Sequence, residues 1–347
     1  MRRKYFLRKQ NMRKKARRIL PRLIVIVLIV LLVLFVRTAS YDEYSGYIQG
    51  TTFTVKCEYD GNISKLHHQI DSILLTVDES ISTYVEGSVI SKFNTSDSGV
   101  VVDTLFKNVF MCAQQIYMES HGDFDPSAAP LIWAYGFGPD KDTLLSDTVL
   151  AKLKNVIGLN RMQFSNGFLK KSHPESKLDF NAIGQGYTVD LVALHLESLN
   201  IRNYLVEIGG EVRVKGKNDK NELWKIGIDR PLENLPNRQI HSVMSLDNKS
   251  FATSGNYRKF YEKDGQRYAH TIDPHTGKSA LSTLLSATVI HESCAMADGY
   301  ATTLMVKGKE EAIAFADSLD LEIYLIYSEG EKLKEYVSES LSDKINH

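Results

Sequence analysis

Hydrophobic and polar residues alternate along the chain with two periods, one typical of strands and one typical of helices. Apolar residues three and four positions apart predict helices at residues 63–82, 103–120, 183–199, 295–307 and 312–319. Period-two alternation and β-branched runs predict strands at residues 51–58, 204–208, 212–215, 224–228, 241–246, 259–271 and 323–327. Strands and helices are mixed throughout, so the pattern predicts an α/β or α+β body. Residues 338–347 form a polar tail that we expect to fray.

The first 36 residues have a different pattern, in which a basic run leads into an aliphatic one. Residues 1–22 carry eleven Lys and Arg and no acidic residue, and residues 23–36 are all apolar. As a helix the aliphatic run spans about 21 Å, and counting back to Ile19, with Arg22 snorkelling outward, lengthens it toward the roughly 30 Å hydrocarbon core of a bilayer. We expect an uncleaved signal anchor, with residues 1–22 cytoplasmic and the body outside.

The alternative for this segment is a cleaved signal peptide, whose apolar region has a similar length. No pair of small residues follows the run at a clean distance, and Arg37 crowds the expected cleavage position. These features favour the anchor over the signal peptide. The resulting expectation is a single-pass protein of the inner membrane with its body on the periplasmic side.

The formal charge of the whole chain is zero, but this balance conceals an acidic body. After residue 36 the chain has 31 basic and 42 acidic residues, a net charge of −11. Nucleic acid is therefore excluded as the main partner, because binding phosphates requires a basic surface. Cys57, Cys112 and Cys294 follow no regular spacing, which excludes a disulfide framework and a zinc knuckle and leads us to expect buried thiols.

The common catalytic motifs are incomplete in this chain. Gly184-Gln-Gly186 lacks the third glycine of a dinucleotide fold, and Gly277-Lys-Ser279 lacks the earlier glycine of a Walker loop. His291-Glu292 has no second histidine three residues later, and there is no G-x-S-x-G elbow. The candidate chemistry therefore comes from segments that combine Asp, Gly, His and aromatic residues, at 123–139, 178–190, 252–277 and 297–304.

Three features of these segments suggest a site. Asp298 and Thr302 are four residues apart on a predicted helix, and an all-oxygen set of this kind suits Mg²⁺. The glycine-containing turn at 182–186 leads into a helix, whose N-terminus is suited to phosphate. His270 precedes an Asp-Pro turn that can aim it into a cleft. Taken alone, residues of this kind more often have a structural role, as a helix cap or a packing histidine.

Eight blocks occur in a characteristic order and spacing: Gly50-Thr51; Ile81-Ser-Thr-Tyr84 with Ser91-Lys-Phe-Asn94; Asp125-Pro with Trp133 and Gly136-Phe-Gly-Pro139; Asp179 with Gly186-Tyr and Asp190; Val206-Glu-Ile-Gly-Gly-Glu211; Ala252-Thr-Ser-Gly255; His270-x-Ile-Asp-Pro-x-Thr-Gly277; and Ala297-Asp-x-x-Ala-Thr302. Together they resemble the FAD:protein FMN transferase (ApbE) family over residues 45–337. The resemblance implies a single large α+β domain with mixed or antiparallel sheets and flanking helices. It also implies Mg²⁺-dependent transfer of FMN from FAD to a threonine of an acceptor protein, such as an FMN-binding redox subunit, with release of AMP.

The resemblance also implies roles for particular residues. His270 matches the base for the incoming threonine. The metal would be held by the side chains of Asp298 and Thr302 and by the carbonyl of Ala182, with only a backbone contact at Ala301, where some members of the family carry Asp. Positions that line the flavin nucleotide in the family are Tyr84, Phe124, Asp125, Asp179, Gln185 and Ile272. Of these, Tyr84 offers a ring for stacking, Asp179 a hydrogen bond to adenine or ribose, and Gln185 replaces a frequent Lys or Glu.

Two other functions fit the same residues. With water in place of threonine, the site would be an Mg²⁺-dependent FAD pyrophosphatase that yields FMN and AMP. A protein without catalytic activity that binds flavin at the membrane is the second alternative. His270, Asp298 and Thr302 argue against the second, because binding alone requires no base.

Overall fold

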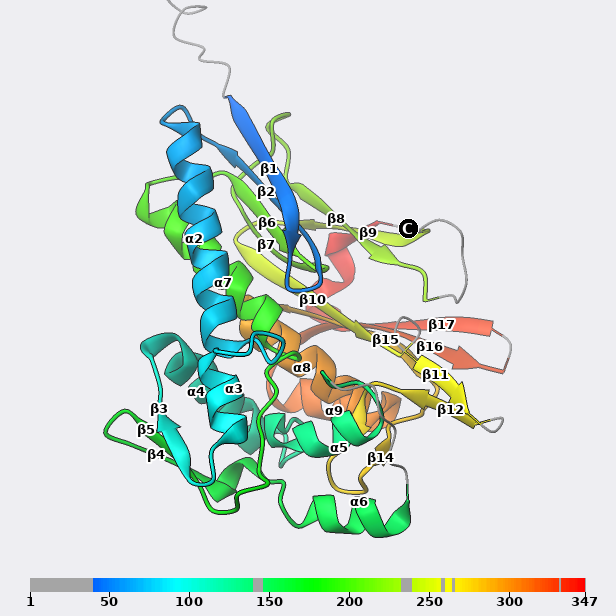
Figure 1. The fold of residues 1–347 in the computed structure, drawn as a ribbon. Coiled ribbons are helices and arrows are strands. Elements are labelled where there is room, and N and C mark those ends of the chain that lie inside the picture. Colours follow the sequence, from blue (N-terminus) through cyan, green and yellow to red (C-terminus); the bar gives the residue numbers. More distant parts are fainter. Residues whose placement is uncertain are drawn as a thin grey trace, which may run out of the picture. The chain divides into compact units, whose positions relative to one another are not determined.

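An eight-stranded antiparallel sheet organises the body of the protein (Figure 1). The structure, a computed structural model, describes residues 40–139, 146–231, 239–256, 260–263, 266–330 and 332–346. In the order of the sheet, the strands are β1 (Tyr41–Ile48), β2 (Thr51–Glu58), β6 (Tyr204–Ile208), β7 (Glu211–Lys215), β10 (Lys249–Gly255), β15 (Leu284–His291), β16 (Glu322–Glu329) and β17 (Lys332–Val337).

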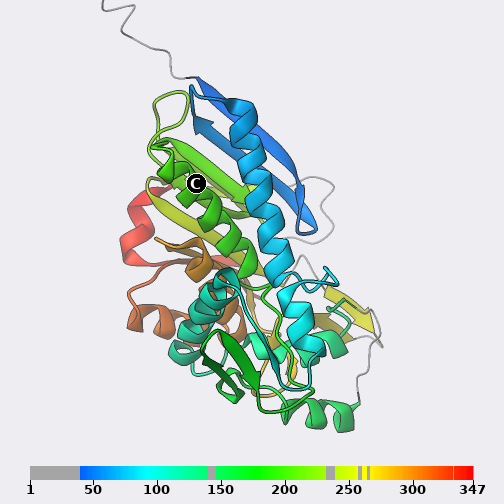
Figure 2. The ribbon, with the colours of Figure 1, turned by 60° about the vertical axis from the view of Figure 1, so that its left-hand side comes forward.

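Helices cover one face of this sheet because apolar residues alternate along its strands and point toward that face. Every second residue of β2, including Phe53 and Val55, packs against the apolar side of α2 (Ile63–Ile81) and of α7 (Gly184–Ser198). Figure 2 shows α2 and α7 side by side across the strands at this end of the sheet. Further along, α8 (Cys294–Lys307) and α9 (Lys309–Ser318) pack with β15 and β16.

A small second sheet covers the opposite face. Its strands lie in the order β18 (Ile345–Asn346), β9 (Ile240–Leu246) and β8 (Trp224–Asp229). The residues of the large sheet that point away from the helices pack against it, as Val212 and Val214 of β7 do against Trp224 and Met244. The body therefore has three layers, and its α+β class is the one that the sequence predicts.

The end of the chain corrects one expectation. Residues 339–344 form a short 3₁₀ helix, η3 (Glu339–Lys344), and β18 pairs with Val243 and Met244 of β9. Leu341 is completely buried against the second sheet. The prediction that this tail frays is wrong for residues 338–346, because Leu341 and Ile345 pack against the second sheet and Ile345 pairs with Met244, about a hundred residues earlier in the chain.

The remaining helices, strands and hairpins belong to neither of these two sheets. They are α3 (Val89–Thr95), β3 (Gly99–Val101), α4 (Thr104–Glu119), η1 (Pro126–Ala128), α5 (Ala129–Ala134), α6 (Asp147–Lys154), η2 (Leu159–Arg161), β4 (Met162–Ser165), β5 (Phe168–Lys171), and the hairpins β11 (Phe260–Lys263) with β12 (Gln266–Ala269) and β13 (Ile272–Asp273) with β14 (Lys278–Ser279). The single strand predicted at 259–271 is thus wrong. Asp264-Gly265, a favoured turn dipeptide, lies between β11 and β12 in the sequence.

Two further expectations concern the cysteines and the N-terminus. Cys57 and Cys294 are buried free thiols, as predicted, whereas Cys112 is half-buried. The predicted anchor at 23–36 lies outside the described residues. Among the residues that are described, no helix is both long enough and apolar enough to cross a membrane.

Candidate active site

Helices α7 and α8 approach each other closely at Gly186. A Cβ atom at this position would lie 2.4 Å from the backbone oxygen of Cys294 and 2.9 Å from Cβ of Asp298. Only glycine fits such a contact between helices. The backbone N–H of Gly186 donates a hydrogen bond to Oδ2 of Asp298 over 3.2 Å. The glycine-containing turn therefore lies directly beside the carboxylate that the sequence picks out as a metal ligand.

Asp298 is a buried carboxylate with few partners. Its side chain is 6% exposed, and the hydrogen bond from Gly186 is the one it accepts from the described residues. Burial raises the pKa of Asp298 to about 7, and the Gly186 N–H opposes this rise. A charge buried in this way is unfavourable unless a cation or further donors accompany it.

Thr302 lies one turn further along α8, and its hydroxyl is 3.1 Å from that of Ser254 on β10. Ala182, just before α7, is half-buried, and Ala301 is completely buried in the core. Among the described residues, no three His, Cys, Asp or Glu side chains gather to hold a metal ion. The oxygen-donor pair of Asp298 and Thr302 nevertheless fits a hard cation, because Mg²⁺ retains several waters and needs few protein ligands.

A cavity of about 490 Å³ opens at the N-terminus of α7. The residues that line it come from the β1–β2 turn, the end of α2, the segment after α2 and the start of α7: Gln49, Gly50, Asp78, Ile81, Ser82, Tyr84, Val85, Phe180, Asn181, Gly184 and Gln185. Tyr84 is 65% exposed, so its ring is open to a ligand. The first turn of α7, with the backbone amide of Gln185, and an aromatic ring thus border one space, a combination suited to a phosphorylated ligand with a flat ring.

Asp179 connects this cavity with a neighbouring aromatic side chain. Its carboxylate accepts hydrogen bonds from the backbone N–H of Asn181 at 2.8 Å and from the indole Nε1 of Trp133 at 3.0 Å. Asn181 itself lines the cavity. Tyr84 and Asp179, both predicted to line the flavin nucleotide, are therefore connected through Asn181.

Phe124 and Asp125 have structural partners in this structure. Phe124 is buried in the main core cluster. Asp125 caps η1, and its Oδ1 accepts hydrogen bonds from the backbone N–H of Ser127 at 2.8 Å and from its hydroxyl at 2.6 Å. Burial raises the pKa of Asp125 to about 6, although these hydrogen bonds oppose the rise. Neither residue is among those that line the cavity.

His270 and Ile272 lie near α5. The imidazole of His270 packs edge-on against Phe137, with 6.2 Å between the ring centroids. Ile272 is buried in the same small cluster, with Leu131 and Tyr135. The hydrogen bonds of the described residues do not join His270 to Asp298 or to Thr302. Within the described part of the chain, His270 thus packs beside Phe137 and is not hydrogen-bonded to the pair formed by Asp298 and Thr302.

Two residues that line the cavity, Gln49 and Asp78, were missed by the sequence analysis. Oδ1 of Asp78 is buried without a hydrogen-bond partner among the described residues, and burial raises the pKa of this carboxyl. One signal was available in the sequence, because an acidic side chain in the last turn of a helix opposes the helix dipole. Gln49 donates a hydrogen bond to Thr188 of α7 at 3.0 Å and offered no such signal.

The fold and the cavity together define an α+β protein that can take up a phosphorylated ligand at a helix N-terminus, beside a buried carboxylate. Residues 49–325 match the family model described as the ApbE family. The match spans most of the chain, which therefore belongs to the ApbE family.

Relatives and solved structures agree with this assignment. The chain is 36% identical over 303 residues to the FAD:protein FMN transferase of Vibrio cholerae, covering 85% of this chain and 90% of the relative. It is 36% identical over 295 residues to the protein of the same name from Haemophilus influenzae, covering 81% and 85%. The flavin transferase ApbE of Vibrio cholerae superposes with a TM-score of 0.81 at 34% identity, over 88% of this chain and 99% of that one. The apo flavinyl transferase ApbE of Pseudomonas stutzeri gives 0.79 at 30%, over 88% and 96%.

Proposed function

We propose that this protein is an FAD:protein FMN transferase that moves FMN from FAD onto a threonine of an acceptor protein and releases AMP. The observation that carries the proposal is the match to the ApbE family over residues 49–325, together with relatives of that name that are aligned over nearly their whole length. The acceptors would be FMN-binding redox subunits with an accessible threonine.

The reaction needs one bond to form and one to break. The threonine oxygen of the acceptor bonds to the FMN-side phosphorus of FAD, the bridging P–O bond breaks, and AMP leaves with the bridging oxygen. The hydroxyl proton must pass to a base, and His270 is our candidate because an imidazole is uncharged and basic near neutral pH. Its imidazole packs edge-on against Phe137, a contact that restricts the orientation of the ring.

The pyrophosphate is our candidate ligand for the turn at the start of α7. The first amides of a helix can bind phosphate oxygens. At the start of α7 the Gly184 N–H donates to the carbonyl of Phe180 at 2.7 Å and the Gly186 N–H to Asp298, so the backbone N–H of Gln185, in the wall of the cavity, is our candidate donor. Tyr84 would stack on a ring of FAD, and Asp179 would accept a hydrogen bond from adenine or ribose. Gln185 would contribute an amide at the same end of the cavity.

Asp298 and Thr302 are our candidates for the residues that hold Mg²⁺, with the carbonyl of Ala182 as a third donor. The support comes from the buried carboxylate and its shortage of donors. When bound there, Mg²⁺ would neutralise negative charge on the pyrophosphate in the transition state. Asp298 would then remain ionised, since a cation offsets the burial of its charge.

We also propose that residues 23–36 anchor the protein in the inner membrane and that the body lies on the periplasmic side. The support is the sequence alone, in which eleven basic residues and no acidic residue precede the aliphatic run. Protease added to the outer face of intact inner membranes should digest the body. Complete protection would contradict this topology.

One experiment tests the activity against its two alternatives. The protein is incubated with FAD, Mg²⁺ and a candidate acceptor, and both the acceptor mass and the nucleotides are measured. A covalent FMN adduct with AMP is the expected result. Free FMN with AMP would indicate a pyrophosphatase, and intact FAD would indicate a binding protein. His270→Ala should lower the rate of adduct formation about 10²–10⁴-fold while FAD still binds, as expected when a general base is removed.

A further inference from the structure

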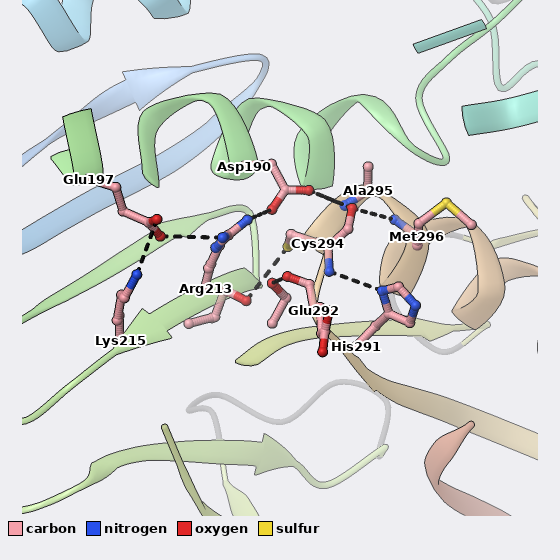
Figure 3. A network of polar contacts seen from close by, with 12 residues as sticks. Asp190, Glu197, Arg213, Lys215, His291, Glu292, Cys294, Ala295 and Met296 are labelled. Carbon is pink, nitrogen blue, oxygen red and sulfur yellow. Dashed lines mark hydrogen bonds and ion pairs between the residues drawn. The ribbon is translucent and has the colours of Figure 1, made fainter. Parts of the chain in front are cut away.

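A network of polar contacts links α7, β7 and the beginning of α8 (Figure 3). Its centre is Asp190 on α7. Oδ2 of Asp190 accepts hydrogen bonds from the hydroxyl of Ser293 at 2.7 Å and from the backbone N–H of Ala295 at 3.1 Å. Oδ1 accepts a charged hydrogen bond from Nη1 of Arg213 at 2.6 Å. A carboxylate of one helix thus caps the N-terminus of its neighbour.

The start of α8 depends on this carboxylate more than usual. Its first turn contains no acidic residue, so no side chain of its own supplies the negative charge that a helix N-terminus favours. The first amides of a helix also lack partners within the helix. Asp190 provides both the charge and an acceptor for Ala295, while Ser293 caps Met296.

Asp190 and Gly186 together fix α8 at two points. They are four residues apart on α7, so they face the same side. Gly186 contacts Asp298 and Asp190 contacts Ala295, and the two pairs run in opposite order along the two helices. The helices are therefore antiparallel at this contact. A shift of the first turn of α8 would move Asp298 away from the Gly186 amide.

Further contacts, with residues outside α8, also hold Asp190 in place. Arg213 of β7 lies between Asp190 and Glu197, with Nη2 3.4 Å from Oε1 of Glu197. Glu197 is in turn contacted by the hydroxyl of Tyr204 at 2.6 Å and by Nζ of Lys215 at 3.1 Å. Burial opposes ionisation of Glu197, but these donors hold its pKa below the ordinary value. Glu197 touches the same arginine as Asp190 and has no described contact with α8.

We propose that Asp190 is a positioning residue for the metal ligand Asp298: it holds the first turn of α8 in register with α7 and thereby keeps the Asp298 carboxylate against Gly186. This inference rests on the proposed function only where it calls Asp298 a metal ligand. The placement of Asp298 by Asp190 is a structural claim and can be tested without metal.

Hydrogen exchange of the Gly186 amide on the full chain without metal is the first test. Asp190→Asn keeps the size of the side chain but removes its charge and one of its two acceptor oxygens, so it cannot accept from both Arg213 and the first turn of α8. The Gly186 amide should then exchange faster by about tenfold or more. Glu197→Gln is the matched control, because it alters the other side of Arg213 and leaves the α8 contacts in place. It should leave the exchange of Gly186 within about twofold of the unchanged protein. Unchanged exchange in Asp190→Asn, or equal acceleration in both variants, would overturn the proposal.

Titration with Mn²⁺, followed by the paramagnetic resonance of the free ion, is the second test. Loss of a residue that orients a metal ligand typically weakens metal binding about 10–100-fold. We expect that loss for Asp190→Asn and not for Glu197→Gln. Equal Mn²⁺ affinity in Asp190→Asn and the unchanged protein would refute the effect on the metal. If the unchanged protein binds no Mn²⁺, the metal assignment fails, while the exchange experiment still decides the positioning role.

Folding of the variants is checked by their unfolding temperatures. If Asp190→Asn does not fold, Ser293→Ala is the milder variant, because it removes one of the donors to Asp190, together with the hydroxyl that caps Met296, and leaves Arg213 paired. It should accelerate exchange of Gly186 in the same direction by a smaller factor. Unchanged exchange in Ser293→Ala together with a folded protein would then contradict the proposal.

Discussion

Two buried carboxylates lie along the contact between α7 and α8, and the chain treats them differently. Asp190 is met by a guanidinium, a hydroxyl and a backbone amide. Asp298, one turn away along the contact, is met within the described part of the chain by the single amide of Gly186. Burial of an ionised carboxylate is unfavourable without compensation. For Asp190 the fold supplies that compensation, whereas for Asp298 we propose that a bound cation supplies it.

We propose that this difference separates a structural carboxylate, Asp190, from a functional one, Asp298. A residue whose partners are all present stabilises the folded protein, and its removal should be felt mainly in stability. A buried charged residue that lacks hydrogen-bonding or ionic partners opposes folding slightly and becomes favourable when it binds a ligand. Activity and stability should therefore respond in opposite ways to changes at the two positions.

The largest expected effect is on stability at Asp190. Asp190→Ala leaves Arg213 buried beside a single carboxylate and removes the cap of α8, and breaking a buried pair in this way typically lowers the free energy of unfolding by about 3–5 kcal/mol. Asp298→Asn, which removes a poorly compensated charge, should leave that free energy unchanged or higher in metal-free buffer. Denaturant unfolding of the two variants measures both. A larger loss of stability at Asp298 than at Asp190 would reverse the comparison.

The second effect is on catalysis at Asp298. Asp298→Asn should lower the rate of FMN transfer about 10²–10³-fold at saturating FAD, because the stabilisation of transition-state charge by a metal is worth several kcal/mol. EDTA should abolish transfer by the unchanged protein, and added Mg²⁺ should restore it. The rate is followed as the mass of the flavinylated acceptor. Undiminished transfer by Asp298→Asn in metal-free buffer would remove the metal assignment.

A third buried carboxylate, Asp125, lies between these extremes, because its hydrogen bonds come from the neutral donors of Ser127. Burial raises its pKa to about 6 from 3.8. A raised pKa in the folded state favours the protonated form, so its stabilising contribution is complete below pH 3.8 and is lost as the pH rises through 6. Asn does not titrate and can keep both hydrogen bonds.

Asp125→Asn should therefore become more stable relative to the unchanged protein as the pH rises. The unfolding free energy of the variant minus that of the unchanged protein should increase by about 2–3 kcal/mol between pH 4 and 7. One pKa unit corresponds to about 1.4 kcal/mol. Unfolding curves at several pH values measure this change. A difference that is independent of pH would mean that Asp125 titrates alike in the folded and unfolded chain.

The sequence predicted the local part of this picture well. Strand β2 begins and ends at the predicted residues, α2 ends one residue before the predicted helix does, and α4 is one residue shorter than predicted at each end. Placement of Asp298 and Thr302 on one side of a helix also followed from their spacing, since residues four apart are neighbours on a helix surface. Helical and strand periods are properties of a short segment and can be recognised there.

The parts that sequence could not predict depend on contacts between distant segments. Arg213 meets Asp190 across 23 positions of the chain, and Ser293 meets it across 103. The position of Asp190 in the sequence does not show whether its carboxylate will have such partners. The sequence indicates a phosphate-binding turn that contains Gly186. The close approach of Gly186 to Cys294 and Asp298 depends on how the two helices pack, which the sequence does not show.

The smallest expected effect is at Thr302, and it tests whether charge or position matters more in the pair on α8. Thr302 offers a neutral hydroxyl, which is 3.1 Å from that of Ser254. Because a water can replace a neutral oxygen ligand more easily than a carboxylate, Thr302→Ala should lower FMN transfer only about tenfold, and Thr302→Ser should restore most of it. Both rates are measured as the mass of flavinylated acceptor at saturating FAD and Mg²⁺. A loss in Thr302→Ala as large as in Asp298→Asn would mean that the hydroxyl does more than hold a metal, and the contrast between compensated and uncompensated carboxylates would then not explain the site.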